Sequence, residues 1–298
     1  MGIGREHLAQ YYDFIASERR FSQATLATYG NAIDVFIDWK FGDGVVDFAG
    51  VSRRDLQDFI IEEQRRCKRT TVRNHASALR SLFRFLFENK KIPMDPSLHL
   101  VTPKLERRLP KIFTISQIKE LLSAPEAAFA RGEISREIAL RDRMIFELFY
   151  GAGLRIGELR NIEIDAVDLA GCSLKVLGKR GKERLCPFSL AAKDAIEKYL
   201  AIRPHPSGSK LLEHGGKLLT AREIQYRLKF YLKFAALPAD LSPHKIRHSF
   251  GTHMLNAGAD LRLLQELLGH SSLSATQVYT RVDSSRMKNV HRNFHPRA

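Results

Sequence analysis

The sequence predicts a mostly α-helical protein of two domains, the second of which also carries a small β-hairpin sheet. Apolar residues recur three and four positions apart through most of the chain, and this is the spacing of one helix face. Four prolines fall within residues 93–110, a stretch without clean periodicity that is typical of a linker. We therefore expect one domain over residues 1–105, with the linker beginning near residue 93, and a second domain over residues 106–298.

The first predicted domain is all α-helical. Its apolar stripes are Leu8, Tyr11, Tyr12 and Ile15, then Ile33, Phe36 and Ile37, then Leu56, Phe59 and Ile60, and finally Leu79, Leu82, Phe83 and Leu86. Ser22 precedes QATLATY and Ser52 precedes RRDLQDF, and a serine oxygen can accept a hydrogen bond from the first turn of the helix that follows it. We therefore expect helices to begin directly after these two serines.

The last helix of this domain is strongly basic. Residues 64–87 hold seven arginines or lysines and no acid, whereas the whole of residues 1–105 holds 16 basic against 13 acidic residues. A charge run is often only a solvated face, but unopposed cations repel one another unless an anion neutralises them. We therefore expect Arg69, Arg73 and Arg80 to contact the phosphate backbone of DNA.

The second predicted domain carries most of the positive charge. Residues 106–298 hold 32 basic and 20 acidic residues, and the pattern is helical except in SLKVLGKRGKERLCPFS, where two strand-like runs flank a Lys-Arg-Gly turn. This segment is predicted to form a β-hairpin whose basic tip suits a phosphate backbone. Neither GxxxxGK[ST] nor GxGxxG occurs, so nothing suggests nucleotide hydrolysis.

The composition favours a nucleic-acid partner. A formal charge of +15 points to a polyanion, with DNA or RNA ahead of an anionic membrane surface. No apolar run approaches the ~18 residues of a spanning helix, and the start MGIGREHLAQ lacks a signal-peptide core. We expect a cytoplasmic protein without a membrane partner. Cys67, Cys172 and Cys186 are odd in number and lack CxxC spacing, which predicts reduced packing residues.

The segment SPHKIRHSFGTHMLNAGAD, residues 242–260, holds three histidines and an arginine. It could hold a metal, handle an anion, or contain histidines that are merely packed or solvated. His244 and His248 lie four apart, as zinc ligands on a helix do, but the sequence reads HKIRH rather than HExxH, and Arg247 would repel a cation. No third ligand lies at a suitable spacing. We therefore expect no metal and no cofactor.

Residues far from this segment in the sequence favour the interpretation that it handles an anion. They are Arg155 in YGAGLRIGELRNI, Lys179 at the predicted hairpin tip, His270 in LLGHSSLSATQ, and Tyr279 in VYTRVD. Arginine can donate two hydrogen bonds at once to phosphate oxygens, and histidine can donate or shuttle a proton near neutral pH. Each residue alone has a plainer explanation, as a capping arginine, a helix-end imidazole or a core tyrosine. The ordered set is what predicts a phosphate-binding site.

The order Arg, Lys, His-x-x-Arg, His, Tyr resembles the tyrosine recombinase (phage integrase) family, and the residues around these positions are similar to those of its Xer branch. The matching segments are YGAGLRIGELRNIEIDAVDL, VLGKRGKERLCPF, HKIRHSFGTHMLNAGADLRLLQELLGHSSLSATQVYTRV and the basic RTTVRNHASALRSLFRFL. Together they cover nearly the whole chain. Phe113 to Ile115 and the insert RGEISRE, residues 131–137, lengthen the region ahead of the first arginine box relative to that family.

The resemblance implies a SAM-like core-binding domain followed by a catalytic domain that cuts and rejoins duplex DNA through a 3′-phosphotyrosine. It assigns Arg155 and Arg247 as phosphate clamps, His244 and His270 as phosphate donors, Lys179 as general acid and Tyr279 as nucleophile. His248 and His253 match no site position, so we expect packing or capping roles for both. Cysteines, metals and cofactors take no part in this chemistry.

The resemblance also implies partners. A tetramer on two DNA recombination sites would resolve chromosome dimers at cell division, either alone or with a related second recombinase and a DNA translocase. A mobile-element integrase and a catalytically idle DNA-binding regulator remain the alternatives. In the family the tail reaches into a neighbouring protomer, so we expect the stripe of Met287, Val290 and Phe294 to be held there rather than on its own domain.

Overall fold

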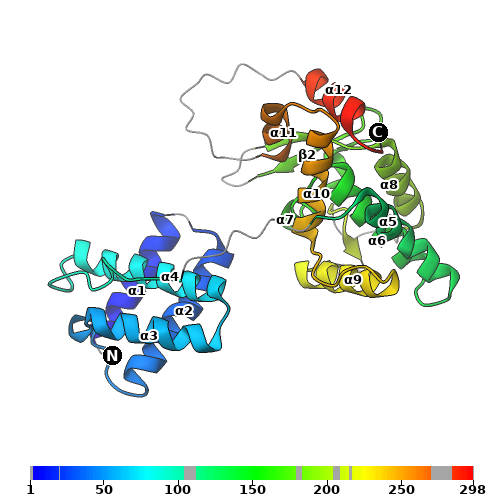
Figure 1. Ribbon diagram of the computed structural model, residues 1–298. Coiled ribbons are helices and arrows are strands. Elements are labelled where there is room, and N and C mark those ends of the chain that lie inside the picture. Colours follow the sequence, from blue (N-terminus) through cyan, green and yellow to red (C-terminus); the bar gives the residue numbers. More distant parts are fainter. Residues whose placement is uncertain are drawn as a thin grey trace. The chain divides into compact units, whose positions relative to one another are not determined.

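The computed structural model describes residues 3–19, 21–103, 112–178, 183–203, 209–214, 217–269 and 284–297. They form two compact units, Met1–Arg108 and Leu109–Ala298, each with its own core (Figure 1). The mostly helical fold with a small hairpin sheet is confirmed. The predicted boundary at 105/106 falls among residues 104–111, outside the described part of the chain, and stays a prediction.

The first unit is a bundle of helices α1 (Ile3–Ser17), α2 (Gln23–Phe41), α3 (Arg53–Arg66) and α4 (Arg69–Glu88), with a 3₁₀ turn at Phe48–Gly50. Both predicted N-caps are confirmed. The side chain of Ser22 accepts a hydrogen bond from the Thr25 amide, and Ser52 forms a reciprocal capping box with Asp55. These serines fix where α2 and α3 begin.

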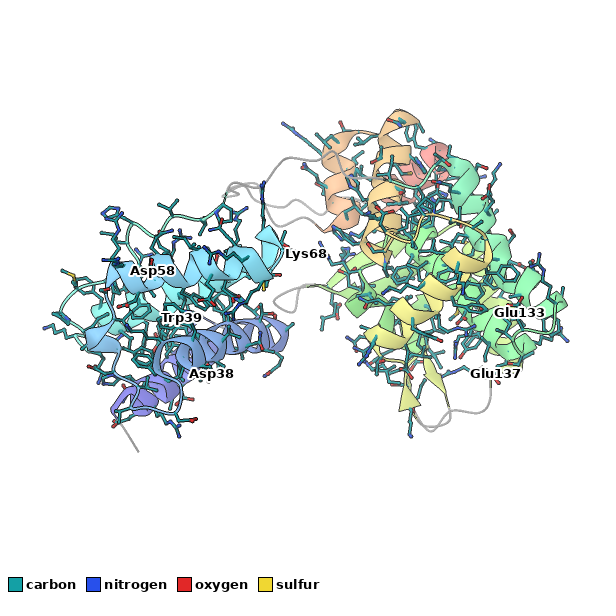
Figure 2. The ribbon with its side chains drawn as sticks, turned by 60° about the horizontal axis from the view of Figure 1, so that its bottom comes forward. Asp38, Trp39, Asp58, Lys68, Glu133 and Glu137 are labelled. Carbon is teal, nitrogen blue, oxygen red and sulfur yellow. The ribbon has the colours of Figure 1, made fainter. Side chains whose placement is uncertain are left out.

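The predicted apolar stripes meet in the interior of this unit. Phe36 lies at the centre, with its ring centroid 5.2 Å from that of Phe59 and 6.1 Å from that of Phe83. The side chain of Trp39, on α2, reaches α3, where its indole Nε1 donates to Glu62 Oε2 at 2.7 Å (Figure 2). The stripe predicted for α4 is fully buried, so the opposite, basic side of that helix faces solvent.

The start of the proline-rich stretch packs on the first unit. Ile92 and Leu100 are buried in its core, and the Val101 amide donates to Gln57 Oε1 at 3.2 Å. Arg80 also holds this stretch, because its Nη2 donates to the carbonyl of Leu100. Up to residue 101 the chain is therefore tied to the first unit.

The second unit contains eight of the described helices: α5 (Ile115–Ala130), α6 (Arg136–Gly151), α7 (Ile156–Arg160), α8 (Leu190–Ile202), α9 (Ala221–Phe234), α10 (Pro243–Asn256), α11 (Leu261–Leu268) and α12 (Ser284–Phe294). Helix α6 is central and buried on nearly all sides, and it contacts α5, α7, α8 and α10. Figure 1 shows α9 at one end of this unit and α11 beside α12 at the other.

The sheet of the second unit has the antiparallel order β1-β2-β3, formed by β1 (Val167–Asp168), β2 (Ser173–Leu177) and β3 (Glu183–Pro187). The predicted hairpin is therefore confirmed, and Val176 lies opposite Arg184 across its strands. Its tip, residues 179–182, lies outside the described residues. A second hairpin, β4 (Glu213–His214) with β5 (Lys217–Leu218), was not predicted, because two-residue strands are too short to show alternation.

Helix α12 folds back onto its own unit. Val290 and Phe294 pack on the core, His291 Nε2 lies 2.6 Å from the Gly151 carbonyl, and His295 Nε2 lies 3.2 Å from the carbonyl of Tyr150. A single chain does not test whether the tail reaches into a neighbouring protomer, so that expectation stays a prediction. Within the chain, these polar contacts of His291 and His295 add to the apolar packing of the tail. Met287 has no described side chain.

Candidate active site

A tight turn places the first arginine. Arg155 is the N-cap of α7 and follows Gly153, whose φ of +59° is costly for other residues. A Cβ on Gly153 would lie 2.6 Å from a ring carbon of Phe250 and 3.1 Å from Leu268 Cδ2. Only glycine lets the chain pass this close to α10 and α11 and deliver Arg155 to the site.

One buried carboxylate gathers three guanidinium groups. Glu158 Oε1 accepts from Arg155 Nη1 at 2.7 Å and from Arg184 Nη1 at 2.8 Å. Its Oε2 accepts from the Arg155 amide at 2.8 Å and from Arg184 Nη2 at 2.9 Å, and Arg247 Nη1 lies 3.6 Å away. Three cations thus surround one anion, and the surplus of two positive charges favours an anionic ligand.

The same three arginines cap the end of α11. Arg184 Nε donates to the carbonyl of Leu267 at 3.2 Å, Arg247 Nη2 to that of Leu268, and Arg155 Nη2 to that of Gly269 at 3.1 Å. The last carbonyls of a helix lack partners within it and lie at the negative end of its dipole, so cations are favourable there. The guanidinium groups therefore have acceptors within the protein.

Gly269 ends α11 in the left-handed conformation, with φ +61°, which is common for a glycine at a helix end. The next residue in the sequence is His270. The capped end of α11 is thus the point from which the chain continues toward two of the predicted site residues, His270 and Tyr279.

Burial and charge set the protonation of this cluster. Burial alone would raise the pKa of Glu158, but hydrogen bonds from Arg184 and Arg155 lower it to about 2. Burial and the neighbouring Arg155 lower the pKa of Arg247 to about 10. Burial raises the pKa of the free thiol of Cys186 to about 11, as expected for a reduced packing residue. Near neutral pH the carboxylate and the guanidinium groups are all charged.

The histidines of residues 242–260 divide by exposure. His244, in the first turn of α10, is exposed, and three residues later Arg247 is only 3% exposed. His253 is buried, with Nδ1 2.9 Å from the hydroxyl of Tyr150, so its predicted packing role is confirmed. His248 is exposed rather than packed.

The structure brings Arg155 and Arg247 together through Glu158. Lys179, His270 and Tyr279 lie outside the described residues, so their predicted roles stay predictions. Sequence analysis missed Glu158 and Arg184. The spacing of a capping box, three residues from N-cap to acid, could have indicated Glu158. Nothing in the sequence separates Arg184 from the other basic residues of the hairpin.

The arginine boxes lie inside a recognised family model. Residues 111–286 match the model of the phage integrase family, and residues 8–90 match that of the phage integrase N-terminal SAM-like domain. The chain belongs to the phage integrase family. The resemblance predicted from the motifs is thereby confirmed, and with it the enzyme class, tyrosine recombinase.

Relatives of this integrase family member carry Xer names. Tyrosine recombinase XerD of Vibrio vulnificus is 37% identical, over 98% of this chain and 96% of its own. Tyrosine recombinase XerC of Pelotomaculum thermopropionicum is 35% identical, over 98% of each chain.

Solved structures share the fold. A lambda integrase dimer bound to a COC′ core site matches 94% of this chain and 100% of its own, with a TM-score of 0.71 and 19% identity. XerH site-specific recombinase bound to its difH substrate matches 94% of this chain and 82% of its own, with a TM-score of 0.68 and 21% identity.

The predicted DNA contacts of this integrase differ in their surroundings. Arg69 and Arg73 are exposed on the first turns of α4, just after its exposed N-cap Lys68 (Figure 2). Arg80 is half-buried and donates to the Leu100 carbonyl. Arg80 therefore has a structural task in the first unit.

Helix α9 presents a basic stripe that sequence analysis missed. Arg222, Tyr226, Lys229 and Lys233 follow one another at helical spacing and are all exposed, Tyr226 to 69%. The acid on this stretch, Glu223, is engaged in the capping box with Thr220. The sequence of α9 has helical spacing, but it does not show that these four side chains are exposed on one side of the folded unit.

The described residues show neither a metal cluster nor a membrane-spanning helix. No three histidine, cysteine or acidic side chains there lie together as metal ligands would. None of the helices described is both long and apolar enough to cross a bilayer.

Proposed function

We propose that this integrase family member is a site-specific recombinase that uses Tyr279 as nucleophile and resolves chromosome dimers in the cytoplasm at cell division. The observation that carries the proposal is that Arg155 and Arg247 converge on Glu158. Arg155 also donates to Gly269, the residue before His270. This arrangement supports an anion-binding role for the two arginines.

The cluster supports phosphoryl transfer by electrostatics. Each Nη atom carries two hydrogens, so the guanidinium groups of Arg155 and Arg247 can donate to phosphate oxygens while they hold Glu158. Fixed donors stabilise the negative charge that gathers on the non-bridging oxygens in the transition state. Exposed His244, one turn from Arg247, can supply a further donor.

The proposed step forms one bond and breaks one. The Tyr279 oxygen bonds to phosphorus, and the 5′ oxygen of the DNA leaves with a proton from Lys179. A free tyrosine with a pKa near ~10 is only about 0.1% ionised at neutral pH, so cationic neighbours favour its attack. Attack by a 5′ hydroxyl on the phosphotyrosine then rejoins the DNA and releases Tyr279.

Two exposed basic faces support DNA binding. The start of α4 carries Arg69 and Arg73, and α9 carries the stripe around Tyr226. Such contacts supply affinity and position the duplex without reading its sequence. Each unit thus offers a face for the phosphate backbone.

We further propose that the chain acts as a tetramer on two DNA sites, with a related second recombinase and a DNA translocase as candidate partners. One structural neighbour, a lambda integrase, is a tetramer bound to a Holliday junction. The Xer names of relatives at 35–37% identity favour dimer resolution over mobile-element integration. An idle DNA-binding regulator would have no need of the six-residue motif.

The test begins with the DNA. Duplexes bound from a randomised pool give the target site, and a nicked duplex of that site traps the covalent adduct. We expect an adduct with the unmodified protein and none with Tyr279→Phe, which should still bind. An adduct that survives in Tyr279→Phe contradicts the nucleophile assignment. A single genomic site near the replication terminus supports dimer resolution, and sites that flank mobile DNA contradict it.

A further inference from the structure

Arg184, which is half-buried, connects two parts of the site. From β3, its two Nη atoms donate to both oxygens of Glu158, at 2.8 and 2.9 Å, and its Nε donates to the Leu267 carbonyl at the end of α11. Its side chain is 13% exposed, against 34% for Arg155. Because its Nε and both Nη atoms donate to protein groups, Arg184 is placed to hold these groups rather than to bind DNA.

We propose that Arg184 is a positioning residue: it fixes Glu158, and through it Arg155 and Arg247, to the end of α11. The inference rests on the proposed function, because the arginines are held for a scissile phosphate. Arg184 itself does not touch the reacting atoms.

The charge balance supports this role. Without Arg184, Glu158 would face only Arg155 and Arg247, and its carboxylate would compete directly with phosphate for their donors. A bidentate pair with Arg184 engages both carboxylate oxygens. Arg184 thereby reduces that competition and holds the carboxylate in one orientation, so Arg155 can share its donors with an incoming anion.

Packing at Gly269 gives an independent reason. A Cβ on Gly269 would lie 3.1 Å from Arg184 Cδ and Nε and 3.2 Å from its Nη1. The Arg184 side chain therefore passes directly across the residue that precedes His270 in the sequence. One side chain thus sets both the arginine cluster and the end of α11 from which the predicted nucleophile segment departs.

Arg203 offers a matched control. It is an arginine of the second unit with a similarly low exposure, 9%, and its guanidinium likewise donates to main-chain carbonyls, those of Lys210 and Glu213. It has no contact with Glu158 among the described residues. Replacement of Arg203 therefore reports what a purely structural arginine contributes to stability.

The experiment compares Arg184→Gln and Arg184→Lys with Arg203→Gln. The probe is the nicked duplex of the selected site, and the readouts are the single-turnover cleavage rate at saturating DNA, the DNA Kd and Tm. We expect Arg184→Gln to slow cleavage on the order of 10²-fold, the scale of a missing preorganised donor, with Kd changed less than about threefold. Arg184→Lys, which cannot fork onto both oxygens, should be slower by at least about tenfold.

The pH profile separates positioning from stability. Without Arg184 the pKa of Glu158 should rise, so cleavage by Arg184→Gln should fall off at a higher pH on the acid side than cleavage by the unmodified protein. Arg203→Gln should lower Tm and leave both rate and profile unchanged. A normal rate in Arg184→Lys overturns the proposal, even if Arg184→Gln fails to fold. If the unmodified protein forms no adduct, the proposed function fails instead.

Discussion

The imidazole rings of His291 and His295, at the end of α12, stack at a centroid distance of 4.7 Å and an angle of 10°. Both rings are buried, and both donate toward main-chain carbonyls of α6. His295 also accepts, at Nδ1, from the Arg297 amide at 3.0 Å. This arrangement requires a neutral His295, because a protonated imidazole has no acceptor nitrogen for the Arg297 amide.

Acid should therefore destabilise the packed tail. Burial lowers the pKa of His291, and burial with the neighbouring His291 lowers that of His295 to about 3. The unfolded chain, with histidine pKa values near ~6.5, binds protons first as pH falls. The free energy of unfolding is therefore highest above about pH 6.5 and declines toward pH 3. Each of the two histidines lowers it by up to about 1.4 kcal/mol for each pH unit. We expect Tm to fall between about pH 7.5 and about pH 5. His291→Gln with His295→Gln should flatten this fall and His248→Gln should not; an unchanged slope contradicts the assignment.

Arg297 anchors the tail through a buried carboxylate. Its Nη2 donates to Glu147 Oε1 at 2.8 Å, and Arg143 holds the same oxygen. Arg297→Ala should lower the free energy of unfolding by about 2 kcal/mol, less than the ~3–5 of a fully broken buried pair, because Arg143 remains. Urea unfolding measures the difference. Arg292→Ala, on the exposed side of α12, should cost less than about 0.5 kcal/mol, and equal effects of the two variants argue against the anchor.

The proposed general acid can be tested by its leaving group. Lys179→Ala should slow cleavage by ~10²-fold or more and should recover on DNA with a 5′-thiolate leaving group, which needs no proton. Lys175→Ala is the control, because Lys175 is exposed on strand β2 of the same hairpin. Without rescue by sulfur, Lys179 is not the acid. Cleavage should persist in EDTA.

The structure divides the predicted DNA contacts of α4. Neutralising Arg69, Arg73 and Arg80 together should weaken binding equally for target and random DNA and should flatten the salt dependence. Arg69→Gln with Arg73→Gln should account for the salt effect, with a slope smaller by about 0.9 for each phosphate that is no longer neutralised. Arg80→Gln should chiefly lower Tm. An unchanged salt slope in the double variant means that this face does not bind DNA.

The stripe on α9 predicts a second set of phosphate contacts. Lys229→Gln with Lys233→Gln should weaken DNA binding and reduce the salt slope. Lys193→Gln with Lys198→Gln, on α8, is the charge-matched control. Filter binding at several salt concentrations compares the two pairs. Equal effects would mean that only net charge matters and that α9 has no special role.

Periodic burial was readable from the sequence. The stripe from Leu79 to Leu86 predicted the buried side of α4, and Ser22 and Ser52 predicted where helices begin. These signals are local, since a helix face and an N-cap are complete within a few residues. The motif also identified Arg155 and Arg247 before the structure brought them together.

Relations that exist only after folding were not readable. Arg184 is one of several basic residues in its hairpin, and its role depends on the distance to Glu158, 26 residues earlier. The tail gave an apolar stripe of three residues, but its docking depends on His291 and His295 reaching carbonyls of α6. Polar contacts between distant segments leave no periodic pattern in the sequence.

The arginine cap on α11 has a consequence for turnover. Arg155 donates to an oxygen of its own chain, the Gly269 carbonyl. A phosphate oxygen that takes this donor replaces one acceptor with another, so the net gain in binding free energy is small. An enzyme that reseals DNA must also release it. When Arg155 donates again to the Gly269 carbonyl, the site can release the rejoined strand. Tight binding of the DNA before and after the reaction then depends on the basic faces outside the site.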